Sequence, residues 1–135
     1  MTFEHEDDTQ EFGRKLYEAP TLDLIHDWFG KMDLKTCSFY ILTGDDGSYV
    51  QCAGIRRKLA IEYRQVINSS YKQFMLGVEK EDKSDSSVHY SSGSIKLKKN
   101  EILTIDDVRI VFDHFFKENS IPLGYLLREL NEDYY

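Results

Sequence analysis

The sequence lacks several features that would define its class at once. No run of residues approaches the ~18 to 20 apolar positions of a membrane-spanning helix, and the start, MTFEHEDDTQ, has no apolar segment of the kind found in a secretory signal. Basic residues are not in excess, since 17 Lys and Arg stand against 24 Asp and Glu, a net charge of −7. Nucleic-acid-binding proteins need a basic stripe. We therefore expect a cytoplasmic protein that binds neither membrane nor nucleic acid.

Sequence motifs of catalysis and of metal binding are also missing. No two histidines have the i, i+4 spacing of a metal pair, and a zinc site needs three or four converging ligands. No glycine-rich loop precedes a helix to hold a phosphate, and no serine stands in a nucleophile-elbow pattern. An acid–base group of Asp23, His26 and Asp27 is conceivable, but a helix start and a helix flank explain it better. We predict no enzyme, no catalytic residue, no cofactor, no metal and no small-molecule substrate.

Cysteine is scarce, with only Cys37 and Cys52. Both fall in one predicted hairpin, whose turn centres on Asp45 and Asp46 and would place Cys52 opposite Phe39. Because the two cysteines would not face each other, we expect two free and partly buried thiols, as is usual in a reducing compartment.

The acidic surplus lies at the two ends of the chain. Residues 1–12 hold five acidic and no basic residues, and residues 129–135 hold three acidic residues, so the rest is nearly neutral. An acidic patch attracts a basic partner and speeds encounter; acidic ends that only keep the protein soluble are the open alternative. Tyrosine is enriched at interfaces, although the terminal tyrosines could equally belong to a frayed end. The predicted partner-binding residues are Glu6, Asp7, Asp8, Asp45, Asp46, Glu62, Glu132, Asp133 and Tyr134.

The pattern along the chain predicts one α+β domain over residues 1–135. We expect an acidic segment at 1–12, a first strand at Gly13–Glu18 and a helix at Leu22–Phe29, with Thr21 as its N-cap. Residues 79–94 are predicted to be a mobile loop, with Ile95–Leu97 rejoining the sheet. Apolar alternation and short turns predict a β-meander, whose strands are Ser38–Thr43, Tyr49–Ala53, Lys58–Val66 and Tyr71–Val78.

A second helix is predicted over Ile105–Glu118. Thr104 and Asp107 form a capping-box pattern, and Asn119 can close the helix in a left-handed conformation. One apolar face is formed by Val108, Val111, Phe112 and Phe115. We expect four to six mostly antiparallel strands, with both helices on one face of the sheet. The other face would present to water or to a partner the side chains of Glu62, Arg64, Lys72 and Gln73.

Two stretches carry a family resemblance. Tyr49–Gly77 contains YVQCAG, RRKLAIEYR and YKQFMLG, and Asn100–Pro122 reads NEILTIDDVRIVFDHFFKENSIP. Together they resemble the first immunity-protein family of bacterial polymorphic toxin systems, over roughly Leu22–Leu130. The matching elements are Ile102 and Leu103, Thr104 to Asp107, Phe115 and Phe116, and Ile121 and Pro122. The family often has a tryptophan soon after the proline, where this chain has Tyr125, Leu126 and Leu127.

The resemblance implies a cytoplasmic protein of a contact-dependent growth inhibition or polymorphic toxin system. Such a protein forms a 1:1 complex with the C-terminal domain of a cognate toxin, often a nucleic-acid deaminase or nuclease, and blocks its basic surface. The family's interface residues vary with the partner, so none is transferred. The alternatives are an adaptor or antitoxin-like binding module unrelated to intercellular toxins, a minor enzyme that uses Cys37 or Cys52 with a histidine, and a longer immunity superfamily.

Overall fold

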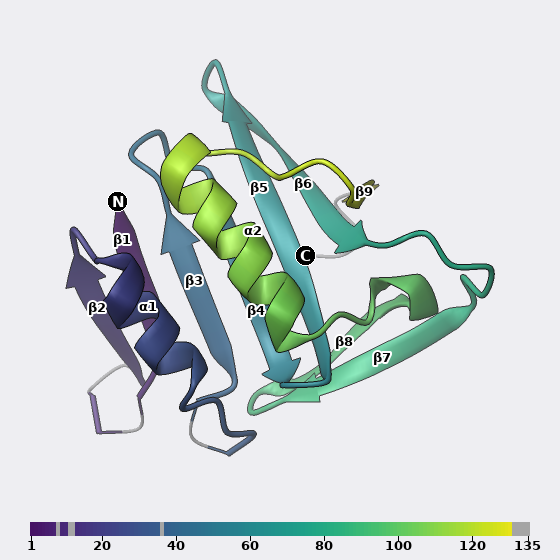
Figure 1. Cartoon of the computed structure of the whole chain (residues 1–135), viewed down its shortest axis with the longest axis horizontal. Coiled ribbons are helices and arrows are strands. Elements are labelled where there is room, and N and C mark those ends of the chain that lie inside the picture. The colour runs from purple at the N-terminus through teal and green to yellow at the C-terminus, as the bar shows by residue number, and fades with distance from the viewer. Residues whose placement is uncertain (8, 11–12, 36, 131–135) are drawn as a thin grey trace.

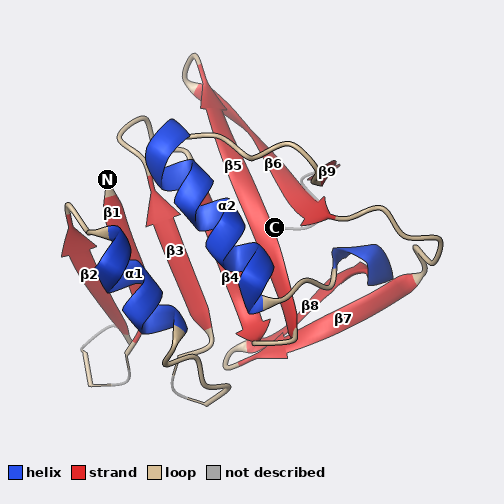
Figure 2. Cartoon of the chain, in the orientation of Figure 1, coloured by secondary structure: helices blue, strands red, loops and turns tan. Residues whose placement is uncertain are grey.

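A seven-stranded antiparallel sheet forms the body of the protein, in the order β2-β1-β3-β4-β5-β6-β9. The computed structural model describes residues 1–7, 9–10, 13–35 and 37–130. Figures 1 and 2 show both helices on one side of this sheet. The strands are β1 (Thr2–Glu6), β2 (Arg14–Glu18), β3 (Phe39–Thr43), β4 (Tyr49–Ile55), β5 (Lys58–Ile67), β6 (Ser70–Gly77) and β9 (Leu126–Leu130). The predicted α+β class is confirmed, with more strands than the four to six expected.

The two helices begin and end where the capping residues indicate. In α1 (Leu22–Phe29), the hydroxyl of Thr21 accepts a hydrogen bond from the backbone N–H of Leu24 at 3.1 Å. In α2 (Ile105–Glu118), the backbone N–H of Thr104 donates to the Asp107 carboxylate at 3.0 Å, which completes the predicted capping box. Asn119 ends α2 with φ of 56°, the left-handed conformation that was expected.

Aromatic side chains join both helices to the centre of the sheet. The rings of Phe29 on α1 and Phe112 on α2 meet edge to face with centroids 5.2 Å apart, and Phe29 meets Tyr40 of β3 in the same way at 5.3 Å. Phe115 makes an edge contact with Tyr63 of β5 at 6.3 Å. Because these phenylalanines are fully buried, the helix-covered face forms the main hydrophobic core.

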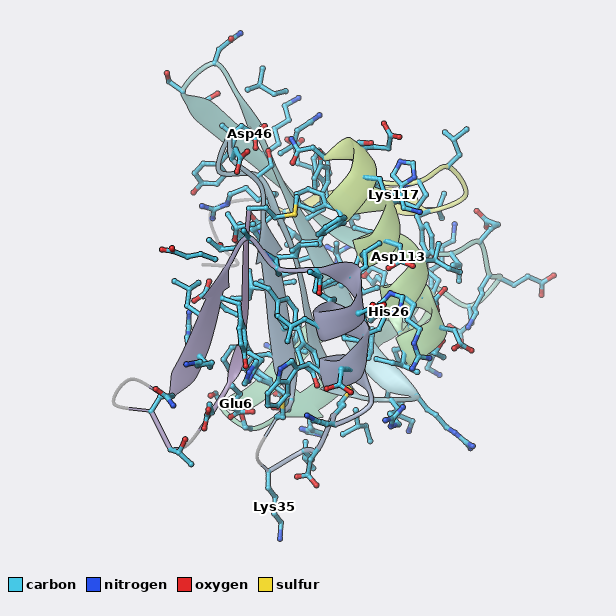
Figure 3. The ribbon with its side chains drawn as sticks, turned by 60° about the vertical axis from the view of Figure 1, so that its left-hand side comes forward. Glu6, His26, Lys35, Asp46, Asp113 and Lys117 are labelled. Atoms are coloured by element: carbon cyan, nitrogen blue, oxygen red, sulfur yellow. The ribbon has the colours of Figure 1, made fainter. Side chains whose placement is uncertain are left out.

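Polar side chains of α2 attach three other parts of the chain to this core. Near its start, Asp107 accepts a hydrogen bond from the Tyr125 hydroxyl at 2.8 Å, in the segment that leads to β9. In its middle, Asp113 lies 2.5 Å from the imidazole of His26 on α1 (Figure 3). At its end, the side-chain amide of Asn119 donates to Asp46 in the β3–β4 turn at 3.0 Å.

The segment predicted as a mobile loop is largely a β-hairpin. Residues 85–98 form β7 (Asp85–Tyr90) and β8 (Gly93–Lys98), which pair only with each other among the described strands, so Ile95–Leu97 does not rejoin the large sheet. Its serines and charges suggested a loop, but Val88 and Leu97 are buried against Ala60 and Met75. Ala60 and Met75 alternate with the helix-facing residues of β5 and β6, so the hairpin covers part of the face opposite the helices.

The acidic N-terminal segment is also more ordered than predicted. Residues 2–6 form β1, which lies inside the sheet between β2 and β3. Phe3 and His5 are fully buried, and the alternating Glu4 and Glu6 lie on the other face. The high acid content concealed a period-two strand pattern.

Both cysteines are free and buried, as expected. Cys52 pairs across the hairpin with Tyr40, one position away from the predicted Phe39. Cys37 precedes β3 and donates its thiol hydrogen to the Tyr40 hydroxyl at 3.3 Å. Burial removes water from both thiols and raises the pKa of Cys37 and of Cys52, so both stay protonated at neutral pH.

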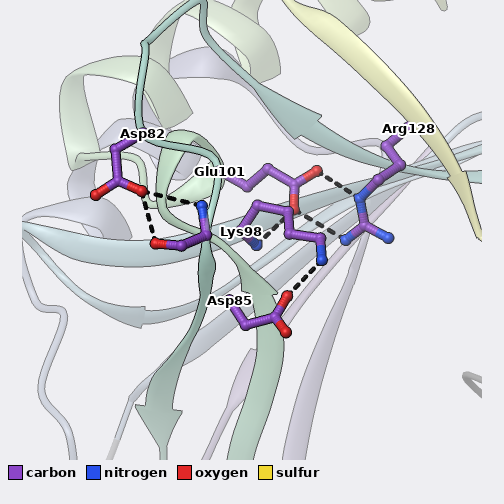
Figure 4. Close-up of polar contacts among 6 residues, drawn as sticks. Asp82, Asp85, Lys98, Glu101 and Arg128 are labelled. Carbon is purple, nitrogen blue, oxygen red and sulfur yellow. Dashed lines mark hydrogen bonds and ion pairs between the residues drawn. The ribbon is translucent and has the colours of Figure 1, made fainter.

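A buried carboxylate holds the last strand in place. After β8, a short 3-10 helix, η1 (Lys99–Glu101), places the Glu101 carboxylate against the guanidinium of Arg128 in β9. Figure 4 shows the forked contact, in which Nε and an Nη group each donate at 2.9 Å. The backbone N–H of Lys98 also donates to Glu101 at 2.8 Å. These bonds join η1, β8 and β9.

Neither described helix has the length and apolar character needed to cross a membrane.

Shortening a core side chain of α2 tests the packing. Phe112→Ala removes a fully buried ring and should lower the free energy of unfolding by about 3–5 kcal/mol. The matched control is Ile110→Ala on the same helix, where the side chain is 54% exposed and the change should stay within about 0.5 kcal/mol. Urea denaturation followed by circular dichroism measures both values. Equal losses in the two variants would contradict the assignment of the buried face.

Candidate partner-binding surface

The face of the sheet away from the helices is only partly covered. A groove of about 1220 Å³ lies between this face and the β7–β8 hairpin. It is lined by sheet residues such as Gln51, Glu62 and Met75 and by hairpin residues such as Tyr90 and Ile95. The hairpin is fixed at its tip because the backbone N–H of Ser91 donates to the Ser38 hydroxyl at 2.8 Å. The groove is therefore built by hydrogen-bonded strands on both sides.

Glu62 is the one predicted partner-binding residue that lines this groove. Its side chain is half-buried in the middle of β5, and its carboxylate accepts a hydrogen bond from the side-chain amide of Gln51 on β4. Burial raises the pKa of Glu62 above its ordinary value; the Gln51 hydrogen bond and the positive charge of Arg64 oppose that rise without cancelling it. The position carries an ionisable group that is incompletely solvated, as binding residues often are.

Next to Glu62 on the same face is a network of aromatic and polar side chains. Tyr49, Arg64 and Gln73 are directly opposite one another on β4, β5 and β6. The Nε of Arg64 donates to the side-chain oxygen of Gln73 at 2.8 Å, and the side-chain amide nitrogen of Gln73 donates to the Tyr49 hydroxyl at 3.1 Å. The guanidinium lies 3.8 Å from the ring centroid of Tyr71 and 5.0 Å from that of Tyr49.

The expected exposure of this face is correct for some positions and wrong for others. Glu62 and Arg64 reach it as predicted. Gln73 belongs to it but is only 2% exposed, since its amide is used inside the network. Lys72 has the opposite parity on β6, so its side chain does not belong to this face.

Two of the predicted acidic residues have structural partners instead of free carboxylates. Glu6 accepts hydrogen bonds from the backbone N–H and the hydroxyl of Ser38, at 2.8 and 3.0 Å, and so fixes the chain just before β3. Asp7 accepts from the hydroxyl and the backbone N–H of Thr9, at 2.6 and 3.0 Å. These hydrogen bonds stabilise the charged form and lower the pKa of Asp7.

The two adjacent aspartates of the β3–β4 turn differ in role. Asp46 accepts hydrogen bonds from the backbone N–H of Ser48 at 2.9 Å and from Asn119, and the Ser48 bond is the main reason that its pKa is lowered. The side chain of Asp45 is 91% exposed, and its one described contact is with the amino group of Met1 at 2.5 Å. Of this pair, Asp45 is the residue that a partner can reach.

The remaining predicted partner-binding residues lie outside the part of the chain that the structure describes. They are Asp8, Glu132, Asp133 and Tyr134.

The acid–base group and the metal site considered from the sequence are the last two candidates. His26 contacts Asp113 on α2, and does not assemble an acid–base group with Asp23 and Asp27. Over the described ranges, no three His, Cys, Asp or Glu side chains are grouped so that they could hold a metal ion.

The chain matches no protein-family model and no curated protein sequence.

Sequence reasoning placed Arg64 and Gln73 on this face but missed the two tyrosines beside them. Each of Tyr49, Tyr71 and Gln73 reads alone as an ordinary strand residue, and only the strand register brings them together. The available signal was their parity: with the turns placed correctly, all three fall on the face opposite the core residues of the same strands.

The raised pKa of Glu62 gives a pH-dependent prediction. The folded protein binds this proton more tightly than the unfolded chain does, so stability falls as the pH rises from the unfolded pKa through the raised folded pKa. Glu62→Gln should therefore be more stable than the wild type at pH 8, and this gain should disappear at pH 4. Urea denaturation at both pH values measures it, with the exposed Glu81→Gln as the matched control. A Glu62→Gln gain that persists unchanged at pH 4 would exclude proton binding as its cause.

Proposed function

We propose that this protein neutralises a cognate bacterial toxin domain by binding it in a 1:1 complex and covering a basic surface of it. The observation that carries the proposal is the part of the large sheet that neither the helices nor the β7–β8 hairpin covers. It presents Tyr49, Arg64 and Tyr71 beside the half-buried Glu62. Tyrosine and arginine are the residue types that dominate binding energy at protein interfaces.

The rigidity of this surface supports a binding role. Its side chains stand on three adjacent strands with continuous antiparallel pairing. The Gln73 side chain is already hydrogen-bonded both to the Tyr49 hydroxyl and to the Nε of Arg64. Side chains that are ordered before binding lose little conformational entropy in the complex, so more of the contact energy appears as affinity.

The charge of the chain supports a basic partner. The net charge is −7, and Asp45 is exposed in the turn that joins β3 to β4. β4 begins at Tyr49, so this turn lies at the end of the sheet where the aromatic surface is found. A net negative charge with an exposed acid near an aromatic surface attracts a basic partner at long range and leaves close contact to the aromatic residues.

The toxin as partner comes from the sequence resemblance. Tyr49–Gly77 and Asn100–Pro122 resemble the first immunity-protein family, which implies a toxin domain that acts on nucleic acid, such as a deaminase or a nuclease. The substrate cleft of such an enzyme must be basic to hold phosphates. An acidic protein with a rigid interface can occupy that cleft or block access to it. We expect the complex to form in the cytoplasm of the cell that makes this protein, where it would protect that cell from the toxin.

Co-expression tests the function directly. The toxin domain encoded immediately upstream of this chain should arrest growth when expressed alone, and co-expression should restore growth and yield a 1:1 complex in size-exclusion chromatography with light scattering. Co-expression of the toxin domain with an empty vector serves as the negative control. Binding to a partner that is not a toxin, with no rescue of growth, would favour an adaptor or antitoxin-like module instead.

Charge reversal at Asp45 tests the steering role. Asp45→Lys should slow association with the toxin domain severalfold and flatten the dependence of the association rate on salt, because rim charges act mainly on the on-rate. Dissociation should change little. Stopped-flow fluorescence at several salt concentrations measures both rates. The matched control is Glu81→Lys, in the loop between β6 and β7. An on-rate for Asp45→Lys equal to that of the control would remove the turn from the encounter surface.

A further inference from the structure

The guanidinium of Arg64 is held in place without a carboxylate in direct contact, although its charge acts on Glu62, two residues away on β5. Its Nε is occupied by the Gln73 carbonyl oxygen at 2.8 Å, and the Tyr71 and Tyr49 rings lie at 3.8 and 5.0 Å. Several of the basic side chains that line the neighbouring groove do have carboxylate partners: Arg128 contacts Glu101, Lys98 contacts Asp85 (Figure 4) and Arg14 lies 3.8 Å from Glu4. Within the described residues, no carboxylate lies within 4.0 Å of the Arg64 guanidinium.

The two terminal nitrogens of Arg64 reach solvent. No hydrogen bond to either Nη group is found within the described chain. Yet that part of the chain contains no buried side-chain nitrogen or oxygen without a partner, so the Nη groups are accessible. The guanidinium is therefore fixed at Nε, lies near two aromatic rings and has Nη groups that a ligand can reach.

The surroundings fix the direction of that end. Gln73 is 2% exposed, and its side chain is restrained because its amide donates a hydrogen bond to the Tyr49 hydroxyl at 3.1 Å. The ring of Tyr71 lies 3.8 Å from the Arg64 guanidinium and is 55% exposed, so it adds accessible apolar surface next to the charge. An arginine that is already oriented in this way loses less side-chain entropy on binding than a free one does.

We propose that Arg64 is the anchor of the interface and receives the carboxylate of an Asp or Glu side chain of the partner protein, with the rings of Tyr49 and Tyr71 packing on either side. The geometry matches the ligand: a carboxylate accepts two parallel N–H bonds from a guanidinium. This inference rests on the proposed function, because the toxin domain is the partner it is tested with.

A phosphate of a nucleic acid also binds arginine, but the neighbourhood opposes it. Tyrosine rings beside an arginine resemble a single-strand-binding surface. However, the Glu62 carboxylate stands two residues away on the same face of β5, and the whole chain has a net charge of −7. A nucleic acid carries negative charge along its whole length and would be repelled by this acidic chain. A partner protein with a largely basic surface would be attracted, and its one carboxylate would need to approach only the Arg64 guanidinium. The charge distribution therefore favours a protein carboxylate over a nucleic-acid phosphate as the ligand of Arg64.

The test compares variants in binding to the upstream-encoded toxin domain by isothermal titration calorimetry. Arg64→Lys keeps the charge but loses the two-pronged geometry, and should weaken binding by roughly thirtyfold or more. Lys72→Ala, on the same pair of strands but with the opposite parity, should leave the dissociation constant unchanged. Thermal unfolding of each free variant, followed by circular dichroism, establishes that the fold is retained.

A second arm locates the carboxylate. Single Asp→Asn and Glu→Gln changes in the toxin domain are titrated against the wild type and against Arg64→Lys. One change should weaken the wild-type complex and have no further effect on the Arg64→Lys complex, as expected for a direct pair.

The outcomes separate the two proposals. If the wild type binds the toxin domain and Arg64→Lys binds equally well, the anchor is wrong and the proposed function stands. If the wild type does not bind at all, both are wrong. A third titration uses a fluorescein-labelled single-stranded DNA 20-mer followed by anisotropy. We expect no binding; binding that is lost in Arg64→Lys would assign the surface to a phosphate backbone and overturn the anchor.

Discussion

The burial of α2 against the centre of the sheet is the contact on which the rest of the structure depends. Phe112 and Phe115 fix the helix against Phe29 and Tyr63, and this position aims its polar side chains at three separate segments. Asp107, Asp113 and Asn119 hold the approach to β9, helix α1 and the β3–β4 turn. None of these bonds could form if the helix were rotated by one residue, since each side chain would then point about 100° away. Apolar packing therefore determines where the polar contacts fall.

The same arrangement makes one face of the sheet a buried core and leaves part of the other face accessible. On one face, the helices bury large aromatic residues. On the other, the β7–β8 hairpin covers only the part around Ala60 and Met75, and it leaves Arg64 and its tyrosines accessible. The acidic residues are divided in a similar way. Glu6, Asp46 and Glu101 each satisfy backbone or side-chain donors inside the fold, whereas Asp45 extends into solvent. Negative charge alone does not distinguish the carboxylates that are used inside the fold from the one that is exposed.

Local signals predicted the helices and the central strands well. The capping patterns at Thr21 and Thr104 span only a few consecutive residues, and the helix starts that they predict do not depend on distant contacts. Strand β1 was missed, and Ile95–Leu97 was assigned to the large sheet instead of to a separate hairpin. In both segments the polar residues outnumber the buried ones, Phe3 and His5 or Val88 and Leu97, and only packing against the rest of the fold shows which residues are buried. The surface around Arg64 required the register of three strands, and a one-residue error such as the one at Cys52 exchanges the faces.

Strand β9 differs from its neighbours in how far along the chain its partner lies. β3 to β6 pair through short turns, so each can form soon after the previous strand. β9 pairs with β6, and residues 78–125, with the hairpin, η1 and α2, come between them. Closing so long a loop carries an entropic cost that short turns do not, and the gain from pairing comes only after the intervening parts are folded. We therefore expect the Glu101–Arg128 contact to form late in folding: a chain interrupted before residue 128 would have the sequence of its meander and α2 but an uncovered edge at β6, open to pairing with another chain.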